Sequence, residues 1–550
     1  MRFGPRAVPF ISIFLFLAIP SCGRKPASLE ALDYIDRRTN VPMVEPVSRD
    51  LAQIRERGEI TVVAPYNSTT YFIYQGEPLG YEYELLEAFA KDLGVALKIV
   101  VVNDPKSLIP ALNEGEGDIA AARLIPNPDN QASAAFTDAL YHTDPVLVQQ
   151  DEPPSEAGKG TEKVIKPGPA DPVSEIDIQA KLVTNPAQLA GRRVDLPEQS
   201  PFRRTLMELS DEISGDIYVV EVGGKIPDEA LAQKVARGEV QFTVMQKNLA
   251  DLKEAEFKNL KVRPILGHTE KVSWAVRKNS PELLAALNSW IADKKKTPLL
   301  NTLYQKYFVD RRRYLERVTS EYLTSTTGKL SEYDPLLKQY AIELNWDWRL
   351  LASQAFQESR FKPATKSWAG ATGLLQLMPK TAKEYGVTNA LDPVDNVQGA
   401  IRFLKALQQY WAKRIADENE RLKFILGSYN AGVGHIEDAQ RLTEKYGGNP
   451  EVWDDVAYWL LQKSTQQYSS DSVVKFGFCR GLEPVNYVNQ ILERFEHYKQ
   501  FVVAGYSRSA WSFSGAISFH ASRRWAASSL SLTRGNSIPI QPAGPTYSGR

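Results

Sequence analysis

Two kinds of hydrophobic spacing divide this chain, and the change between them limits the folds that it can adopt. Short β-branched runs alternate with helical patterns in the first half, for example at 60–64, 81–93 and 97–102. From Asp334 onward, apolar residues recur only with the spacing of helices. Alternation predicts a layered α/β domain with a largely parallel sheet, and purely helical spacing predicts a compact all-α domain. We therefore expect a multidomain protein, with a two-lobed α/β domain followed by an all-α domain.

The expected elements follow from these patterns together with Gly, Pro and polar boundary residues. A stretch at 151–174, rich in Pro, Gly, Glu and Lys, interrupts the alternation and is predicted to be an exposed excursion. The predicted strands are 60–64, 97–102, 119–122, 193–196, 217–222 and 240–245, and the predicted helices are 81–93, 106–113, 228–237, 334–344, 347–358, 395–416, 421–429, 451–462 and 487–500.

The charge balance argues against a nucleic-acid partner, and the histidine spacing argues against a metal site. The 550 residues contain 66 basic and 66 acidic side chains, so the formal charge is zero and no strong attraction to a polyanion is implied. We therefore expect no nucleic-acid partner. The five histidines are scattered without the spacing of metal ligands, so we expect neither a metal site nor a cofactor.

The N-terminus is typical of an exported protein. Arg2 and Arg6 precede an apolar run at 8–19, which is too short to span a bilayer and suits a signal peptide. Ser21 before Cys22 resembles a bacterial lipoprotein signal, which implies that Cys22 is lipidated and that residues 1–22 are the signal. The residue after Cys22 is Gly rather than Asp, and this favours the outer membrane in that resemblance. Plain secretion with a chance cysteine is the alternative.

The chain contains one further cysteine, Cys479. If Cys22 is lipidated, no disulfide can form within the chain, so stability must come from packed cores. We interpret Cys479 as a buried structural thiol.

Glu358 is the strongest candidate for chemistry. Residues 347–361 contain no Gly or Pro, and helical spacing puts Leu351, Ala355 and Glu358 on one stripe, at the end of a helix. Burial against apolar neighbours and the negative end of the helix dipole both disfavour ionisation, so we expect a raised pKa. A raised pKa keeps a proton available for a leaving oxygen. The alternative is an ordinary solvated glutamate.

Three motifs then occur in a fixed order. The first contains Glu358-Ser359 and Gly-Leu-Leu-Gln at 373–376. The second is Ser-Tyr-Asn-Ala-Gly at 428–432, and the third is Leu-Glu-Pro-Val-Asn-Tyr-Val at 482–488. In this order they resemble the catalytic domain of lytic murein transglycosylases. The resemblance implies that Glu358 protonates the glycosidic oxygen between N-acetylmuramic acid and N-acetylglucosamine. As a carboxylate it then takes the proton from the muramyl 6-hydroxyl, which gives a 1,6-anhydro end without water.

The same resemblance assigns roles to residues of these motifs. For Tyr429 and Tyr487, the alternative to a role in the site is that they are ordinary core aromatics whose hydroxyl groups are hydrogen-bonded. The implied roles are hydrogen bonding and orientation of Glu358 by Ser367, glycan binding by Gln376, a place close to the acid for Tyr429, loop bracing or acetamido contact by Asn430, lining of the cleft by Tyr487, and structural support by Glu483.

The first domain resembles family-3 periplasmic solute-binding proteins. The resemblance is carried by the phrases at 58–62, 79–86 and 112–120, with weaker ones in the second lobe. It implies a small ligand or muropeptide between two lobes. In that family an arginine after the strand at 119–122 clamps a ligand carboxylate. No basic residue stands at the expected place, and we interpret Arg123 as a surface residue rather than a substitute.

These observations predict the domain boundaries. We expect a signal peptide at 1–22, a tether at 23–50, the solute-binding-like domain at 51–312, a linker at 313–331, the transglycosylase domain at 332–500 and a disordered basic tail at 501–550. The combination resembles membrane-bound lytic transglycosylases. It implies peptidoglycan glycan strands as substrate, a lipid anchor, and a place at the periplasmic face of the outer membrane.

Three functions remain open at this point. The first is a lipid-anchored peptidoglycan lyase whose N-terminal domain senses a ligand. The second is a binding or scaffold protein with a catalytically silent lysozyme-like domain, although Glu358 is intact. The third keeps the fold but uses water as the nucleophile, which would make the protein a muramidase.

Overall fold

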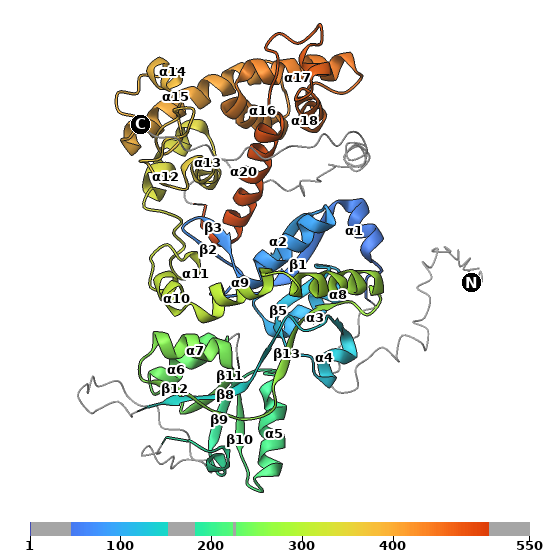
Figure 1. Ribbon diagram of the computed structural model, residues 1–550, viewed down its shortest axis with the longest axis vertical. Helices are drawn as coiled ribbons and strands as arrows, with labels where there is room; N and C mark the ends of the chain where they lie inside the picture. Colours follow the sequence, from blue (N-terminus) through green and yellow to red (C-terminus); the bar gives the residue numbers. More distant parts are fainter. Residues whose placement is uncertain (2–45, 152–181, 224–226, 505–550) are drawn as a thin grey trace, which may run out of the picture. The chain divides into compact units, whose positions relative to one another are not determined.

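The computed structural model describes Met1 and residues 46–151, 182–223 and 227–504 (Figure 1). The predicted signal peptide with Cys22, nearly all of the predicted excursion at 151–174 and the tail beyond residue 504 lie outside these residues. Among the described helices, none is long and apolar enough to cross a membrane.

The first domain contains two lobes, as the alternating pattern predicts. Its elements are α1 (Leu51–Arg57), β1 (Glu59–Ala64), β2 (Phe72–Tyr74), β3 (Glu77–Leu79), α2 (Tyr81–Leu93), β4 (Ala96–Val101), α3 (Pro105–Glu114), β5 (Ile119–Leu124), α4 (Pro128–Ser133), β6 (Ala135–Phe136), β7 (Tyr141–Thr143), β8 (Pro145–Gln150), η2 (Pro186–Leu189), β9 (Arg193–Pro197), α5 (Phe202–Glu212), β10 (Tyr218–Val222), α6 (Asp228–Ala236), β11 (Phe242–Gln246), α7 (Lys247–Glu256), β12 (Leu260–Ile265), β13 (Glu270–Val276), α8 (Pro281–Lys295), α9 (Leu299–Tyr304) and η3 (Gln305–Val309).

The first lobe is built on a sheet with strand order β4-β1-β5-β13-β6, with β7 beside β13. β1 pairs in parallel with β4 and β5, whereas β13 runs antiparallel to β5 and β6. The sheet is therefore parallel on one side only. Successive residues of β1 face opposite ways, so Val62 packs in the core that contains α2 and Val63 packs in the core that contains α3.

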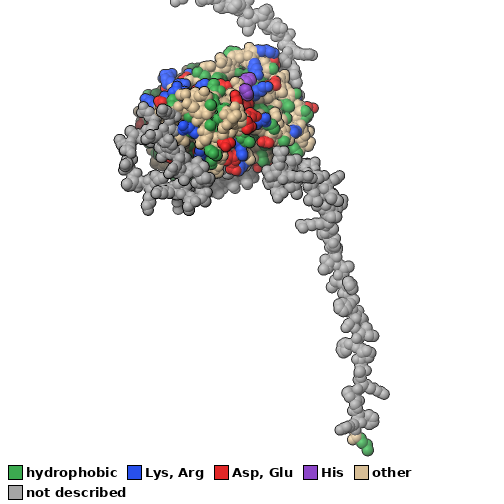
Figure 2. All heavy atoms as spheres, turned by 90° about the horizontal axis from the view of Figure 1, so that it is seen from below, with side chains coloured by type: hydrophobic (Ala, Val, Ile, Leu, Met, Phe, Trp, Pro, Cys, Tyr) green, Lys and Arg blue, Asp and Glu red, His purple; other side chains and the backbone are tan. Residues whose placement is uncertain are grey.

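The second lobe contains the strand order β11-β8-β12 and the parallel pair β9 and β10. The chain enters this lobe between β7 and β8 and returns between β12 and β13. The lobes are thus joined by two crossings. The face shown in Figure 2 exposes both basic and acidic side chains.

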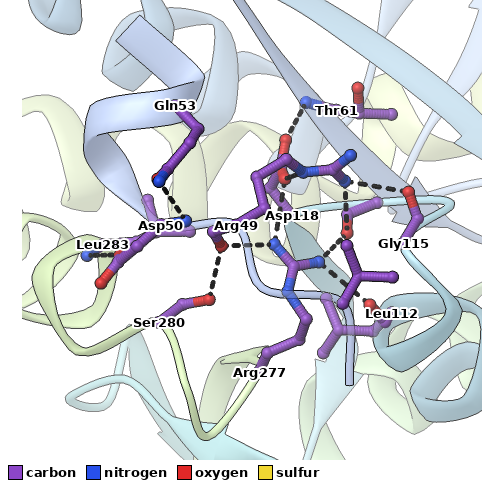
Figure 3. Close-up of polar contacts among 12 residues, drawn as sticks. Arg49, Asp50, Gln53, Thr61, Leu112, Gly115, Asp118, Arg277, Ser280 and Leu283 are labelled. Carbon is purple, nitrogen blue, oxygen red and sulfur yellow. Dashed lines mark hydrogen bonds and ion pairs between the residues drawn. The ribbon is translucent and has the colours of Figure 1, made fainter. Parts of the chain in front are cut away.

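A buried ion cluster anchors the start of the first domain (Figure 3). The fully buried Asp118 carboxylate contacts the guanidinium groups of Arg49 at 2.6 Å, Arg57 at 2.6 Å and Arg277 at 3.1 Å. Burial alone would raise the pKa of Asp118. The bond from the Thr61 amide and the nearby guanidinium groups instead hold that pKa below its usual range.

The predicted tether at 23–50 therefore ends too late. Arg49 belongs to the ion cluster, and the Asp50 carboxylate accepts hydrogen bonds from the Glu282 and Leu283 amides at the start of α8. Residues 46–50 are part of the folded domain because their polar side chains satisfy groups far away in the sequence.

The predicted linker at 313–331 is also folded. It contains most of α10 (Arg311–Val318) and all of α11 (Thr324–Thr327). Tyr314 and Leu323 are buried, and the Gln75 amide donates to the Tyr322 carbonyl at 3.0 Å. The composition of this segment is mostly charged or Thr/Ser-rich, so the sequence did not indicate that Tyr314 and Leu323 pack against neighbouring elements.

The second domain is helical, as predicted. Its elements are α12 (Asp334–Leu344), α13 (Trp348–Ser359), α14 (Pro379–Glu384), α15 (Pro393–Ala412), α16 (Glu418–Ala431), α17 (Val433–Lys445), α18 (Trp453–Gln462), α19 (Gln466–Ser469) and α20 (Leu482–Phe501). α13 packs against α20, and α16 packs against α15, α17 and α20. Trp411 and Trp453 are among the largest buried side chains of this core.

The hairpin of β2 and β3 contacts the end of α20. The Tyr498 hydroxyl donates to the Gly76 carbonyl at 2.6 Å, and the Tyr71 hydroxyl hydrogen-bonds His497 Nδ1. Gly76 has φ of 79°, and a Cβ there would lie 2.5 Å from the Phe361 ring. A glycine is therefore required at this turn both for its conformation and for the close approach.

Candidate active site

Glu358 lies on the last turn of α13, one residue before the helix ends. The Asp347 side chain caps the start of this helix by accepting from the Arg349 amide, and Leu351 and Ala355 are fully buried on the stripe predicted from the sequence. Arg360 follows in the left-handed conformation with φ of 52° and turns the chain away. The helix thus presents a partly buried carboxyl group at its end.

The Glu358 carboxyl group is held by a tyrosine of α20. The Tyr487 hydroxyl donates to Glu358 Oε1 at 2.5 Å, and Gln354 Nε2 donates to the same hydroxyl oxygen at 3.2 Å. Burial raises the pKa of Glu358 to about 8, and the Tyr487 hydrogen bond acts in the opposite direction. The predicted rise in the pKa is confirmed, with burial as its cause. A carboxyl group of this kind is protonated at neutral pH and can act as a general acid.

The Gly-rich loop after α13 is fixed mainly by Asn396. This fully buried side chain accepts from the Leu375 amide at 2.8 Å and donates to the Thr372 carbonyl at 3.0 Å. Gly373 fits beside it with φ of 93°, because a Cβ there would lie 2.2 Å from Asn396 Nδ2. The Asn396 side chain therefore ties the loop to the start of α15.

Ser367 and Gln376 both stabilise this loop from within. Ser367 Oγ accepts from the Ala371 amide at 2.9 Å, and Gln376 Nε2 donates to the Thr365 carbonyl at 2.9 Å and to the Gly373 carbonyl at 2.8 Å. Among the described residues, Ser367 makes no hydrogen bond with Glu358. The residue that hydrogen-bonds Glu358 is instead Tyr487.

Tyr429 connects α16 to the same loop. Its hydroxyl donates to the Leu375 carbonyl at 2.7 Å, and its ring lies 5.1 Å from the Phe403 ring. Burial and the nearby Glu358 charge both raise the pKa of Tyr429 well above its usual value, so Tyr429 is close to the acid as expected. Asn430 is exposed, and its contact with an acetamido group stays a prediction.

Of the remaining predicted residues, Glu483 and Cys479 are described and Cys22 lies outside the described residues. Glu483 is exposed in the first turn of α20, where its charge interacts favourably with the helix dipole. Cys479 is buried, as predicted, and burial raises its pKa. In the described part of the chain no group of three His, Cys, Asp or Glu side chains could hold a metal ion.

Two polar residues of the site were missed from the sequence, Gln354 and Asn396. Gln354 interrupts the apolar stripe one turn before Glu358, and that interruption was the available signal. Asn396 stands inside a helix start of ordinary polar composition, so no local pattern marks it.

Arg123 in the first domain corrects another prediction. It is not a surface residue, because its side chain is only 10% exposed and its guanidinium lies 2.6 Å from Thr69 Oγ1 and 3.6 Å from Glu229 Oε1. Thr69 belongs to the first lobe and Glu229 to α6 of the second. Arg123 therefore joins the lobes.

Comparisons with known proteins follow the same division of the chain. The model of bacterial extracellular solute-binding proteins, family 3, matches residues 43–310, and the model of the transglycosylase SLT domain matches residues 335–452. A solved ancestral amino-acid-binding protein, described as a precursor of cyclohexadienyl dehydratase, is 21% identical with a TM-score of 0.36 and covers 47% of this chain and 99% of its own.

Curated relatives span most of the chain. A protein of Aeromonas hydrophila subsp. hydrophila is 30% identical over 460 residues, which cover 82% of this chain and 84% of the relative. Proteins of Vibrio cholerae serotype O1 and Vibrio campbellii are 31% and 32% identical and cover 82% of this chain and 81% and 82% of their own lengths. All three are called membrane-bound lytic murein transglycosylase F. This chain belongs to the family of membrane-bound lytic murein transglycosylase F.

Proposed function

We propose that this chain is a peptidoglycan lytic transglycosylase in which Glu358 is the single acid and base. Protonated Glu358 gives its proton to the glycosidic oxygen between N-acetylmuramic acid and N-acetylglucosamine, and that bond breaks. The resulting carboxylate takes the proton of the muramyl 6-hydroxyl, whose oxygen bonds to the anomeric carbon and closes the 1,6-anhydro ring. The observation that carries this proposal is the burial of Glu358, with its pKa raised to about 8.

The proposed mechanism uses a single carboxyl group. Glycosidases that use water normally place a second carboxylate nearby as base or nucleophile. Burial raises the pKa of Glu358 and the Tyr487 hydrogen bond lowers it. Among the described residues, no charge of a second carboxyl group contributes to this shift. An intramolecular hydroxyl nucleophile needs no second carboxylate, only a sugar held in the right geometry.

The loop and the tyrosines supply the binding site in this proposal. Ser367 and Gln376 lie on the loop that Asn396 fixes, and Tyr429 joins that loop to α16. We propose that these residues, with Asn430 and Tyr487, hold the glycan against Glu358. Glu483 stabilises the start of α20.

Ligand binding in the first domain would modulate the lyase through the β2–β3 hairpin. Thr69 hydrogen-bonds Arg123, which pairs with Glu229 of the second lobe. Tyr71, two residues after Thr69, hydrogen-bonds His497 on α20. α20 also carries Tyr487, the partner of Glu358. A small ligand or muropeptide that changes how the lobes close would therefore act on the same helix that holds the acid.

We also propose a lipid anchor at Cys22 and a place at the periplasmic face of the outer membrane. The sequence around Cys22 and the words "membrane-bound" in the names of the relatives support this proposal. Labelling of cells with a radioactive fatty acid tests it, because wild-type protein should carry the label and Cys22→Ala protein should not.

The reaction class is tested by digestion of purified sacculi in ¹⁸O water with the chain lacking its first 22 residues. Mass spectrometry of the products should find 1,6-anhydromuramyl ends without ¹⁸O. Reducing ends that carry ¹⁸O would identify a muramidase that uses water. No released products, at enzyme concentrations that saturate binding to sacculi, would favour the catalytically silent scaffold.

A further inference from the structure

Gln354 is a buried polar residue that is linked to Glu358 through the Tyr487 hydroxyl. Its side chain is fully buried on α13, one helical turn before Glu358. Its Nε2 lies 3.2 Å from the Tyr487 hydroxyl oxygen, and that hydroxyl lies 2.5 Å from Glu358 Oε1. The three side chains form a relay from the core of the domain to the carboxyl group.

The chemistry of these groups gives the relay a direction. An amide nitrogen can only donate, so the Tyr487 oxygen accepts from Gln354. A tyrosine hydroxyl has a single hydrogen, which is then free for Glu358 Oε1. The carbonyl oxygen of a carboxylic acid is a stronger acceptor than its hydroxyl oxygen. Acceptance of this hydrogen by Glu358 Oε1 therefore favours Oε2 as the oxygen that carries the proton.

The position of Gln354 has a cost that packing does not explain. In the described part of the chain, its Oε1 is buried without a hydrogen-bond partner. An unsatisfied buried acceptor is destabilising, whereas leucine or methionine would fill a similar volume without any polar atom. Local violations of this kind are expected where a residue serves a function rather than stability.

We propose that Gln354 is a positioning residue that fixes the direction of the Tyr487–Glu358 hydrogen bond and thereby keeps the transferable proton on Glu358 Oε2. The proposal rests on the role of Glu358 as the acid of the proposed function. Without Gln354, the Tyr487 hydroxyl can rotate and accept from Glu358, which would leave the proton on the wrong oxygen. It would also donate more weakly, because hydrogen bonds in a chain polarise one another.

The test is the pH dependence of kcat on soluble glycan strands, measured with the full chain in detergent and with its Gln354→Met variant. The Tyr487 bond lowers the pKa of Glu358, so a weaker bond should raise that pKa. We expect the alkaline limb of kcat to move up by about 0.5–1 pH unit, with KM changed less than about twofold. Gln354→Leu replaces this variant if the methionine protein does not fold.

Two further variants separate positioning from a structural role. Gln357→Met makes the same change at the next glutamine, which bonds Gln490 and Arg494, and should leave the alkaline limb in place. In a Tyr487→Phe background, Gln354→Met should cause no further movement of the limb, because its route to Glu358 is already gone. A limb that is unmoved by Gln354→Met, or moved equally in both backgrounds, would overturn the proposal.

Failure of the proposed function would look different. If Glu358→Gln retains wild-type activity, Glu358 is not the acid and both proposals fall. If Glu358→Gln is inactive while Gln354→Met keeps a wild-type pH profile, only the positioning role is overturned.

Discussion

The Tyr487 hydroxyl donates to Glu358 Oε1 at 2.5 Å, which joins the ends of two helices that are 129 residues apart in the chain. The bond forms because α13 and α20 pack against each other. It orients a carboxyl group whose burial favours the neutral form. The arrangement makes the acid strength of Glu358 depend on a residue that the sequence places far away.

Replacement of Tyr487 by phenylalanine should therefore change the pH profile of catalysis. The lost hydrogen bond raises the pKa of Glu358, and the alkaline limb of kcat, expected near pH 8, should move up by about one unit. We also expect kcat at pH 6 to fall about 10-fold, because the acid is no longer oriented. Tyr458→Phe, a half-buried tyrosine on α18, is the matched control. An unchanged limb in Tyr487→Phe would contradict the account.

The raised pKa of Glu358 also predicts how stability depends on pH. The folded pKa of about 8 lies above the ordinary 4.5, so the unfolded chain loses its proton first as the pH rises. This contribution to stability is complete below pH 4.5 and is lost progressively up to pH 8. Glu358→Gln has no such loss. Its stability relative to wild type should therefore grow by about 2–4 kcal/mol over this window.

Thermal unfolding of both proteins from pH 4 to pH 9 measures this difference. The unfolding midpoints of the helical domain in the two proteins should move apart as the pH rises, with the higher midpoint in Glu358→Gln. Parallel curves would mean that Glu358 is ionised and solvated in the folded state.

Gly373→Ala should disrupt the loop that carries Ser367 and Gln376. The new Cβ would lie 2.1 Å from the Ala390 carbonyl and 2.2 Å from Asn396 Nδ2, and φ of 93° is itself strained for alanine. We expect a loss of at least about 2 kcal/mol of stability and a weaker affinity for glycan strands.

The matched control for that change is Gly447→Ala. Gly447 has φ of 88°, but open space surrounds the added Cβ. It should lose only about 1 kcal/mol from backbone strain, as measured by thermal unfolding. Equal losses in both variants would show that the contacts of Asn396 do not hold the loop.

Asp118→Asn should strongly destabilise the first domain. The change leaves three guanidinium groups around a neutral amide, and breaking a buried pair costs about 3–5 kcal/mol. Since the folded pKa of Asp118 lies below the ordinary 3.8, the wild-type advantage is present above that value and is lost as the pH falls through the folded pKa.

The control variant is Asp293→Asn, because the Asp293 carboxylate is 68% exposed and pairs with Lys296. Calorimetry at pH 7 should find a large drop in the midpoint for Asp118→Asn and almost none for Asp293→Asn. Similar midpoints for the two would contradict a stabilising role of the cluster.

Local patterns predicted the elements well where caps and glycines mark the ends. The helices at 81–93 and 334–344 were predicted with their observed bounds, since Gly94 and Asn345 end them in the left-handed conformation. The two-lobed first domain, the helical second domain and the buried end of α13 were likewise predicted from periodicity.

Long-range contacts were not predictable in this way. The tether and the linker had polar compositions, yet Asp50 and Tyr314 are fixed by partners far along the chain. Arg123 and Gln354 also take their meaning from partners on other elements, Glu229 and Tyr487. The spacing of apolar residues predicts which side chains share a face of a helix. It does not predict which groups of other helices those side chains contact.

Digestion of sacculi by matched glutamate variants tests whether Glu358 is the acid and base of the lyase, as we propose. The experiment compares the release of 1,6-anhydromuramyl products by wild type, Glu358→Gln and Glu384→Gln. Glu384 is an exposed glutamate on α14 and provides the control. Wild type and Glu384→Gln should release equal amounts, and Glu358→Gln should release at least about 1,000-fold less, since removal of the acid also removes the base. Substantial release of anhydromuramyl products by folded Glu358→Gln protein would contradict this proposal.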